Sequence, residues 1–271
     1  MEPNLVALSL GAIVGLILAL SGAGGGILAV PLLVFGLHLT IMQAAPVGLI
    51  AVGVSSALGA VLSLRAGLVR YRAAALIGLV GMALAPFGLL LARHIPNVPL
   101  TVAFSFVLAL VAWRMFRQVR GTGLEDAPLA RQPCVLNPAE GRLIWTAPCA
   151  WALAGTGATS GILSGLLGVG GGFVIVPALS RFTDVSMRGI LATSLAVIAL
   201  VSVGGVTAAA VQGSVAWNVA LPFAAGASTA LLLGRTIAAR LAGPRLQQAF
   251  AVTCAGVSVL LLARAFGWLA A

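Results

Sequence analysis

Two clusters of glycine are the residues in this sequence whose spacing is best suited to binding chemistry. Each contains three glycines in a row: Gly24, Gly25 and Gly26, and Gly170, Gly171 and Gly172. Both lie inside long apolar stretches, where consecutive glycines interrupt a helix. A helix that restarts after such a break leaves its first N–H groups unpaired, and these groups carry about half a positive charge. We therefore expect each cluster to offer backbone N–H groups to an anion.

A valine–proline pair follows each cluster. Pro31 and Pro177 lie beyond the first turn of the restarted helix, where proline prevents regular hydrogen bonding, so we interpret them as helix breaks. Their alternative role is a simple kink. Glycines in membrane helices also serve as packing surfaces, with small residues three or four positions apart. Because three consecutive glycines followed by a proline do not fit that spacing, we favour an anion site for the pair of clusters.

The clusters belong to an internal repeat. Residues 22–33 match residues 168–179 at an offset of 146, and seven of the twelve positions are identical. The same offset relates further small residues: Gly11 and Gly157, Gly15 and Gly161, Ser56 and Ser202, Gly59 and Gly205, Gly67 and Gly213, and Gly88 and Gly234. We therefore predict two related halves, residues 1–120 and 143–271, joined by a polar cytoplasmic linker over residues 121–142.

The composition indicates the environment of these halves. Hydrophobic residues make up 61% of the chain and charged residues only 7%, whereas about a quarter of the residues in a soluble domain are charged. The mean hydropathy is +1.15. The chain is therefore expected to be an all-α polytopic membrane protein. Lysine is absent, and the 15 arginines lie mainly between apolar runs, so we interpret them as topology signals rather than nucleic-acid contacts.

Apolar stretches long enough to cross a bilayer as helices define the elements around the clusters. Six are uninterrupted: residues 43–64, 73–92, 98–113, 189–211, 217–233 and 246–263. Two others, residues 5–37 and 146–179, are longer and contain the glycine clusters. We predict that these two are broken helices.

The arginines predict how the halves are oriented. If each broken helix enters and leaves on one side, each half crosses the membrane three times, and every arginine except Arg93 and Arg264 falls on one side. If each broken helix crosses, the bias is much weaker. The positive-inside rule favours the first arrangement. We therefore predict an inverted repeat in the bacterial inner membrane, with two re-entrant helix hairpins and both termini in the periplasm.

Other candidate site residues are few. Thr193 and Ser194 closely follow the second cluster and are our candidates for substrate contact, although hydroxyls in helices often bond to their own backbone. Arg181 and Arg188 are candidates for a cationic vestibule, although arginines at helix ends often reach for lipid headgroups. The cysteines, Cys134, Cys149 and Cys254, are scattered, so we expect no disulfide framework and no metal site, and we expect no cofactor.

These motifs resemble one family. The duplicated Gly-x-Gly-Gly-Gly-x-x-x-Val-Pro, the Ala-Thr-Ser-Leu run of residues 192–195 and the segment 213–217 are similar to the sulfite exporter TauE/SafE family of membrane permeases. The resemblance implies transport of sulfite, sulfoacetate and related sulfur-containing anions across the bacterial inner membrane. The first half departs from the pattern, since Val47 and Gly48 stand where the second half has Thr193 and Ser194.

The expected function is export of a small sulfur-containing oxyanion by alternating access around a central site. No carboxylate lies in a predicted span, and an inside-negative potential would expel an anion without a coupled ion. An uptake permease and a channel-like facilitator are the alternatives. An intramembrane enzyme is disfavoured because neither His38 nor His94 lies in a span. The expected partners are the anion and membrane lipid, not nucleic acid, and a homodimer is left open.

Overall fold

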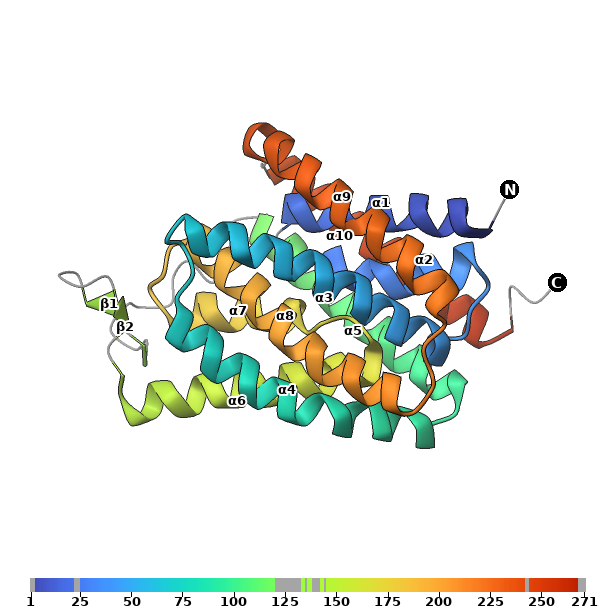
Figure 1. Ribbon diagram of the computed structural model, residues 1–271, viewed down its shortest axis with the longest axis horizontal. Helices are drawn as coiled ribbons and strands as arrows, with labels where there is room; N and C mark the ends of the chain where they lie inside the picture. Colours follow the sequence, from blue (N-terminus) through green and yellow to red (C-terminus); the bar gives the residue numbers. More distant parts are fainter. Residues whose placement is uncertain are drawn as a thin grey trace.

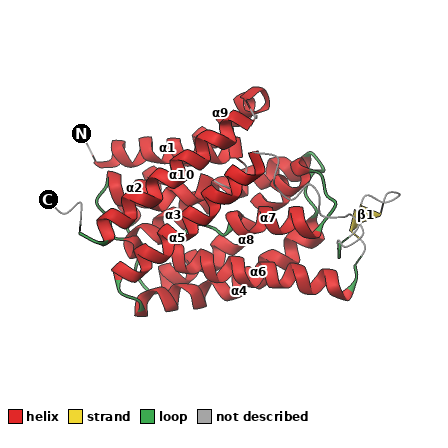
Figure 2. Cartoon of the chain, turned by 180° about the vertical axis from the view of Figure 1, so that it is seen from behind, coloured by secondary structure: helices red, strands yellow, loops and turns green. Residues whose placement is uncertain are grey.

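The computed structural model describes residues 3–21, 25–119, 133–134, 136–137, 142–143, 145–241 and 244–267, and these form an almost entirely helical molecule (Figures 1 and 2). The first half contains α1 (Pro3–Ser21), the 3₁₀ helix η1 (Gly25–Leu28), α2 (Ala29–Gly36), α3 (Ile41–Arg65), α4 (Tyr71–His94) and α5 (Asn97–Val119). The second contains α6 (Ala147–Leu167), α7 (Gly172–Phe182), α8 (Met187–Val211), α9 (Trp217–Leu241) and α10 (Pro244–Ala265). Between them, β1 (Leu136–Asn137) pairs antiparallel with β2 (Arg142–Leu143).

The helices run along the long axis of the molecule and alternate in direction. In Figure 1, α1 runs away from the end that carries the N-terminus, and α2 turns back toward that end. The remaining helices of the first half then cross the molecule three times. The second half begins at the opposite end, beside β1 and β2, where α6 and α7 form the equivalent hairpin. Both termini therefore lie at one end, and the connection between the halves lies at the other.

The halves are interleaved rather than side by side. The first helix of each half packs against the third full-length helix of the other half, so that α1 contacts α9 and α6 contacts α4. Likewise, α3 contacts α9 while α8 contacts α4. The remaining large contacts, α3 with α8 and α5 with α10, join equivalent helices of the two halves. This reciprocal pattern is that of an inverted repeat.

Glycines make these helix contacts close, and they do so in repeat-related pairs. A Cβ on Gly11 would overlap the backbone of Phe223, and one on Gly157 would overlap the backbone of Ile77. The two contacts are images of each other, because both pairs of equivalent residues differ by 146. A second pair of equivalent contacts lies one helical turn further on, where Gly15 packs against Ala227 and Gly161 packs against Gly81. These four glycines therefore have the packing role that small residues often have in membrane helices.

The N-terminal caps of the two central helices, α3 and α8, are also equivalent residues of the two halves. Thr40 caps α3 by accepting a hydrogen bond from the N–H of Gln43, whose side chain bonds back to the Thr40 N–H in a capping box. Its equivalent in the second half, Ser186, caps α8 by accepting from the N–H of Gly189. Local sequence thus fixes where both central helices begin.

Within the described residues, five helices are long and apolar enough to cross a membrane: α3, α4, α5, α8 and α9. The sixth predicted span corresponds to α10, whose apolar stretch, Ala251–Ala265, is shorter. Large apolar side chains are exposed along the outside, among them Phe87, Phe106 and Trp151. Such a surface suits lipid rather than water. The protein is an all-α polytopic membrane protein.

Candidate functional site

The break in the second half is a turn made by glycines. α6 ends at Leu167, and Gly168, Gly170 and Gly171 adopt positive φ angles of 73°, 74° and 72°. Residues with a side chain rarely adopt this conformation, which explains why glycine is needed there. Gly172 then begins α7, with Gly171 as an N-cap that has no side-chain hydrogen bond. The N-terminus of α7 therefore starts inside the molecule.

The break in the first half lies between α1 and η1. Gly24 falls outside the residues that the structure describes, whereas Gly25 and Gly26 begin η1 and are buried. A Cβ on Gly25 would overlap the backbone of Leu18 in α1. The hairpin can therefore turn this tightly only because position 25 lacks a side chain.

The two breaks meet in the interior. A Cβ on Gly26 would stand 2.8 Å from the carbonyl oxygen of Val169, and one on Gly48 would stand 3.1 Å from that of Gly168. The side chain of Val52 in α3 contacts both turns, since it lies 3.1 Å from the Cβ positions of Gly26 and Gly170. Two re-entrant hairpins that enter from opposite ends thus touch backbone to backbone at the centre.

Both prolines lie within the restarted helices. Pro31 is the third residue of α2 and Pro177 the sixth of α7, and each helix continues past its proline. Because Pro31 lies in the first turn of α2, its missing N–H removes no hydrogen bond within that helix. The glycines, and not the prolines, make the breaks.

Three buried serine hydroxyls in the described chain have no hydrogen-bond partner: those of Ser56, Ser164 and Ser202. Ser56 and Ser164 are fully buried and Ser202 is 2% exposed. Ser202 Oγ lies 3.7 Å from the Cβ position of Gly170, and Ser164 lies on α6 one turn before Gly168. Unpaired buried hydroxyls are costly and therefore point to a ligand. The sequence signal for two of them was the 146-residue offset, but nothing in the sequence indicated that they lack partners.

The predicted contacts Thr193 and Ser194 lie elsewhere on α8. Thr193 accepts a hydrogen bond of 3.1 Å from the backbone N–H of Arg70 and lines a small pocket with Arg70 and Thr183. Ser194 donates to the Leu191 carbonyl oxygen of its own helix at 2.8 Å. Thr193 is nine residues from Ser202, so it lies more than two turns of α8 from the hydroxyl that faces the glycine turn.

Arg181 and Arg188 are exposed and flank the loop between α7 and α8, at the end of the molecule where the connection between the halves lies. The structure does not bring them to the glycine turns. His38 and His94 are also exposed.

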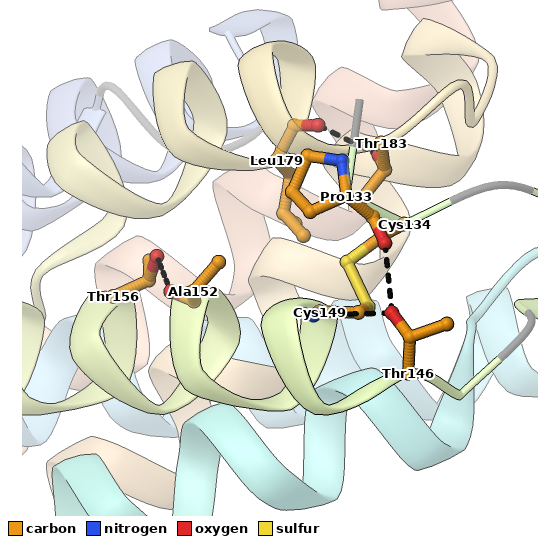
Figure 3. Close-up of a disulfide and its surroundings, with 8 residues drawn as sticks. All are labelled: Pro133, Cys134, Thr146, Cys149, Ala152, Thr156, Leu179 and Thr183. Atoms are coloured by element: carbon orange, nitrogen blue, oxygen red, sulfur yellow. Dashed lines mark hydrogen bonds between the residues drawn. A yellow bond between two sulfur atoms is a disulfide. The ribbon is translucent and has the colours of Figure 1, made fainter. Parts of the chain in front are cut away.

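The expectation of no disulfide was wrong. Cys134 and Cys149 are joined across a sequence separation of 15 (Figure 3). The backbone N–H of Cys134 donates to the Phe182 carbonyl oxygen at 3.1 Å, and Thr146 donates to the Pro133 carbonyl oxygen at 3.2 Å. The chain thus returns past the end of α7 before it enters α6. Sequence spacing carried no signal for this pairing, because it depends on the path of the linker. Cys254 is a free, buried thiol.

The comparisons with known proteins agree with this architecture. A family model described as "Sulfite exporter TauE/SafE" matches residues 7–261. The chain belongs to the sulfite exporter TauE/SafE family. This assignment confirms the resemblance inferred from the duplicated glycine motif, and the match covers both halves of the chain.

Three proteins that are similar in sequence to this chain are named as transporters. Two proteins from Xylella fastidiosa, one from strain 9a5c and one from strain Temecula1, are 30% and 31% identical to this chain. Each match covers 98% of this chain and 98% of the relative. A protein from Methanocaldococcus jannaschii is 27% identical over 72% of this chain and 68% of its own. All three carry the name "Probable membrane transporter protein". No solved structure matches. This TauE/SafE family member is a membrane transporter.

Proposed function

We propose that this transporter exports small sulfur-containing oxyanions, such as sulfite or sulfoacetate, by alternating access around the point where the two glycine turns meet. The observation that carries the proposal is the contact of Gly26 with Val169, with unpaired serine hydroxyls beside it. Secondary transporters build central sites in this way, from discontinuous helices contributed by inverted halves. The family description supplies the sulfur-containing substrate class.

The chemistry of the centre favours an anion. α7 points its N-terminus, the positive end of its dipole, into the interior at Gly171 and Gly172. Asp184, in the loop between α7 and α8, is the one acidic side chain among the residues that the structure describes. The described membrane helices therefore carry no carboxylate that would repel an anion or relay a proton.

The arginines support a direction. Arg65, Arg70, Arg117, Arg181 and Arg188 lie at helix ends beside the linker, and Arg93 and Arg264 lie at helix ends on the opposite side. By the positive-inside rule the linker end is cytoplasmic and the termini are periplasmic. An inside-negative potential of 100 mV then contributes about 2.3 kcal/mol per elementary charge toward expulsion of an anion. Arg181, Arg188 and the pocket at Arg70 and Thr193 form the cytoplasmic vestibule in this proposal.

Flux in liposomes tests the proposal. The purified protein is reconstituted, a potassium diffusion potential is imposed, and efflux of sulfite, sulfoacetate, thiosulfate, sulfate and taurine is measured. We expect saturable efflux of sulfite or sulfoacetate that increases with the potential and shows counterflow. Conduction without saturation or counterflow would instead indicate a channel. Movement of none of these solutes, or their chemical conversion without flux, would overturn the proposal.

A further inference from the structure

The central helices α3 and α8 cross on the symmetry axis that relates the two halves. Leu49 of α3 contacts Gly205 of α8, and Leu195 of α8 contacts Gly59 of α3. Each contact is the image of the other under the 146-residue offset, so the axis passes midway between them. Gly53 lies in this middle stretch, with its Cβ position 2.6 Å from the Cβ of Ser202.

Ser56 and Ser202 are equivalent residues on either side of this axis. Each lies one helical turn beyond an apolar residue that contacts a glycine turn, because Val52 contacts Gly26 and Ile198 contacts Gly170. Residues four apart share a helix face, so each serine continues the face that meets the glycine turns. The two hydroxyls therefore belong to the same central region, one from each half.

Several other buried serine hydroxyls of this protein do form hydrogen bonds, unlike those of Ser56 and Ser202. Ser63 and Ser105, which are also buried, donate to carbonyl oxygens four residues earlier in their own helices, both at 2.8 Å. Such backbone bonding is the ordinary fate of a serine inside a helix. Ser56 and Ser202 have the same local option, but neither hydroxyl bonds to any group of the described chain.

A cation binds α3 about one helical turn after Ser56. Arg235 of α9 is half-buried and donates from Nη1 to the carbonyl oxygen of Gly59 at 3.0 Å and to Ser63 Oγ at 3.4 Å. Gly59 lies three residues after Ser56, on the same face of α3. Both acceptors are uncharged, so these bonds leave the positive charge of Arg235 in place. That charge favours an anionic ligand beside the serines.

We propose that the Ser56 and Ser202 hydroxyls bind the transported oxyanion, each donating a hydrogen bond to one of its oxygens. This inference rests on the proposed function and deepens it by naming the side chains that contact the substrate. The ligand class is a small anion with at least two acceptor oxygens, since the two donors come from opposite sides of the axis. The glycine turns and the N-terminus of α7 complete the site with backbone N–H groups.

The test combines binding and stability. Wild type, Ser56→Ala, Ser202→Ala and the double variant are purified, and affinities for sulfite, sulfoacetate, thiosulfate, sulfate, phosphate and nitrate are measured by thermal shift. Hydrogen bonds to charged groups imply a loss of affinity of about tenfold for each single variant and about a hundredfold for the double variant. Ser105→Ala is the matched control, because it removes a buried but hydrogen-bonded hydroxyl on α5, which packs mainly against α10, and it should keep wild-type affinity.

A second readout separates a binding role from a structural one. Removal of an unpaired buried hydroxyl relieves a desolvation cost, so the ligand-free double variant should melt a few degrees above the wild type. A double variant that is at least as stable as the wild type and binds weakly supports the inference. A lower melting temperature in the ligand-free double variant, or an equal affinity loss in Ser105→Ala, would overturn it.

The outcomes for the two proposals are distinct. If sulfite or sulfoacetate binds to the wild type and the double variant retains that affinity within twofold, the serine assignment fails and the proposed function stands. If only phosphate or nitrate binds, and the serine variants lose it, the serine assignment stands and the sulfur-containing substrate class fails. If no anion binds to the wild type, both proposals fail.

Discussion

Gly26 of the first half packs directly against the carbonyl oxygen of Val169 in the second half, with only 2.8 Å between that oxygen and the point where a Cβ on Gly26 would stand. This contact joins the tips of two hairpins that enter the molecule from opposite ends. Any movement that opens the centre to one side must slide or separate these backbones. In the alternating-access mechanism that we propose, this contact therefore lies where the two halves must move.

Gly26→Ala should impair transport while the protein still folds. The added methyl group forces the two turns apart, and misplacement of site groups by a fraction of an ångström to 1 Å can cost roughly 10- to 100-fold in rate. We expect sulfite efflux from liposomes to fall about tenfold or more. Gly155→Ala is the control, because position 155 of α6 has no atom within 4 Å of its Cβ position. Equal flux in both variants would indicate that Gly26 serves only in helix packing.

The packing glycines should behave differently from the glycines of the turns. Gly15→Leu places a side chain into the backbone of Ala227, and overpacking of this kind costs about 1–3 kcal/mol or more. We expect a lower melting temperature and less monodisperse protein in detergent, measured by fluorescence-detected size-exclusion chromatography. Gly161→Leu should reproduce the defect at the equivalent contact. Gly256→Leu, at an open position of α10, should leave the elution profile unchanged.

Much of the architecture was predictable because it depends on local sequence. The lengths of the apolar stretches predict the helices, and the consecutive glycines predict where two of them break. The 146-residue offset predicts the repeat without knowledge of any tertiary contact. The arginine distribution predicted re-entrant hairpins, and α1–α2 and α6–α7 confirm them (Figure 1). These features need no knowledge of which helix packs against which.

The site was less predictable because it depends on tertiary neighbours. The sequence favours Thr193 because it closely follows the second glycine cluster, yet α8 places it at the pocket beside Arg70, while Ser202 faces Gly170. Ser56 and Ser202 are ordinary serines by type, and only the structure reveals that neither hydroxyl has a hydrogen-bond partner among the described residues. The bond between Cys134 and Cys149 likewise depends on how the linker folds back.

Arg264 should stabilise the end of the first hairpin. Its Nη1 donates to the carbonyl oxygen of Val34 at 3.1 Å in the last turn of α2, and its guanidinium lies 5.8 Å from the ring centroid of Phe35. A cation at a helix C-terminus contributes about 0.3–1 kcal/mol at an exposed position. Arg264→Met should therefore lower the melting temperature by up to about 4 °C. Arg93→Met, at the same end of the molecule, is the control, and an equal decrease there would show that only net charge matters.

The redox state of Cys134 and Cys149 should report which end faces the cytoplasm. In the orientation that we propose from the arginines, the linker end lies in the cytoplasm, where thiols are kept reduced. The structure joins the two sulfurs at that end, at the N-terminus of α6. With that orientation we expect this bond to be reduced in growing cells and to form on oxidation of the purified protein.

Acid quenching of cells followed by alkylation with a maleimide polymer under denaturing conditions measures this state. Three modified cysteines, including the free thiol Cys254, are expected in cells, and one after oxidation of the purified protein. Cys134→Ser should give two under both conditions. Closing a loop of about 15 residues is worth about 3 kcal/mol in the chain-entropy model, so oxidation should also raise the melting temperature of the wild type but not of this variant. A bond already intact in cells would place the linker in the periplasm and both termini in the cytoplasm, and the membrane potential would then no longer support the direction of transport assigned from the arginines.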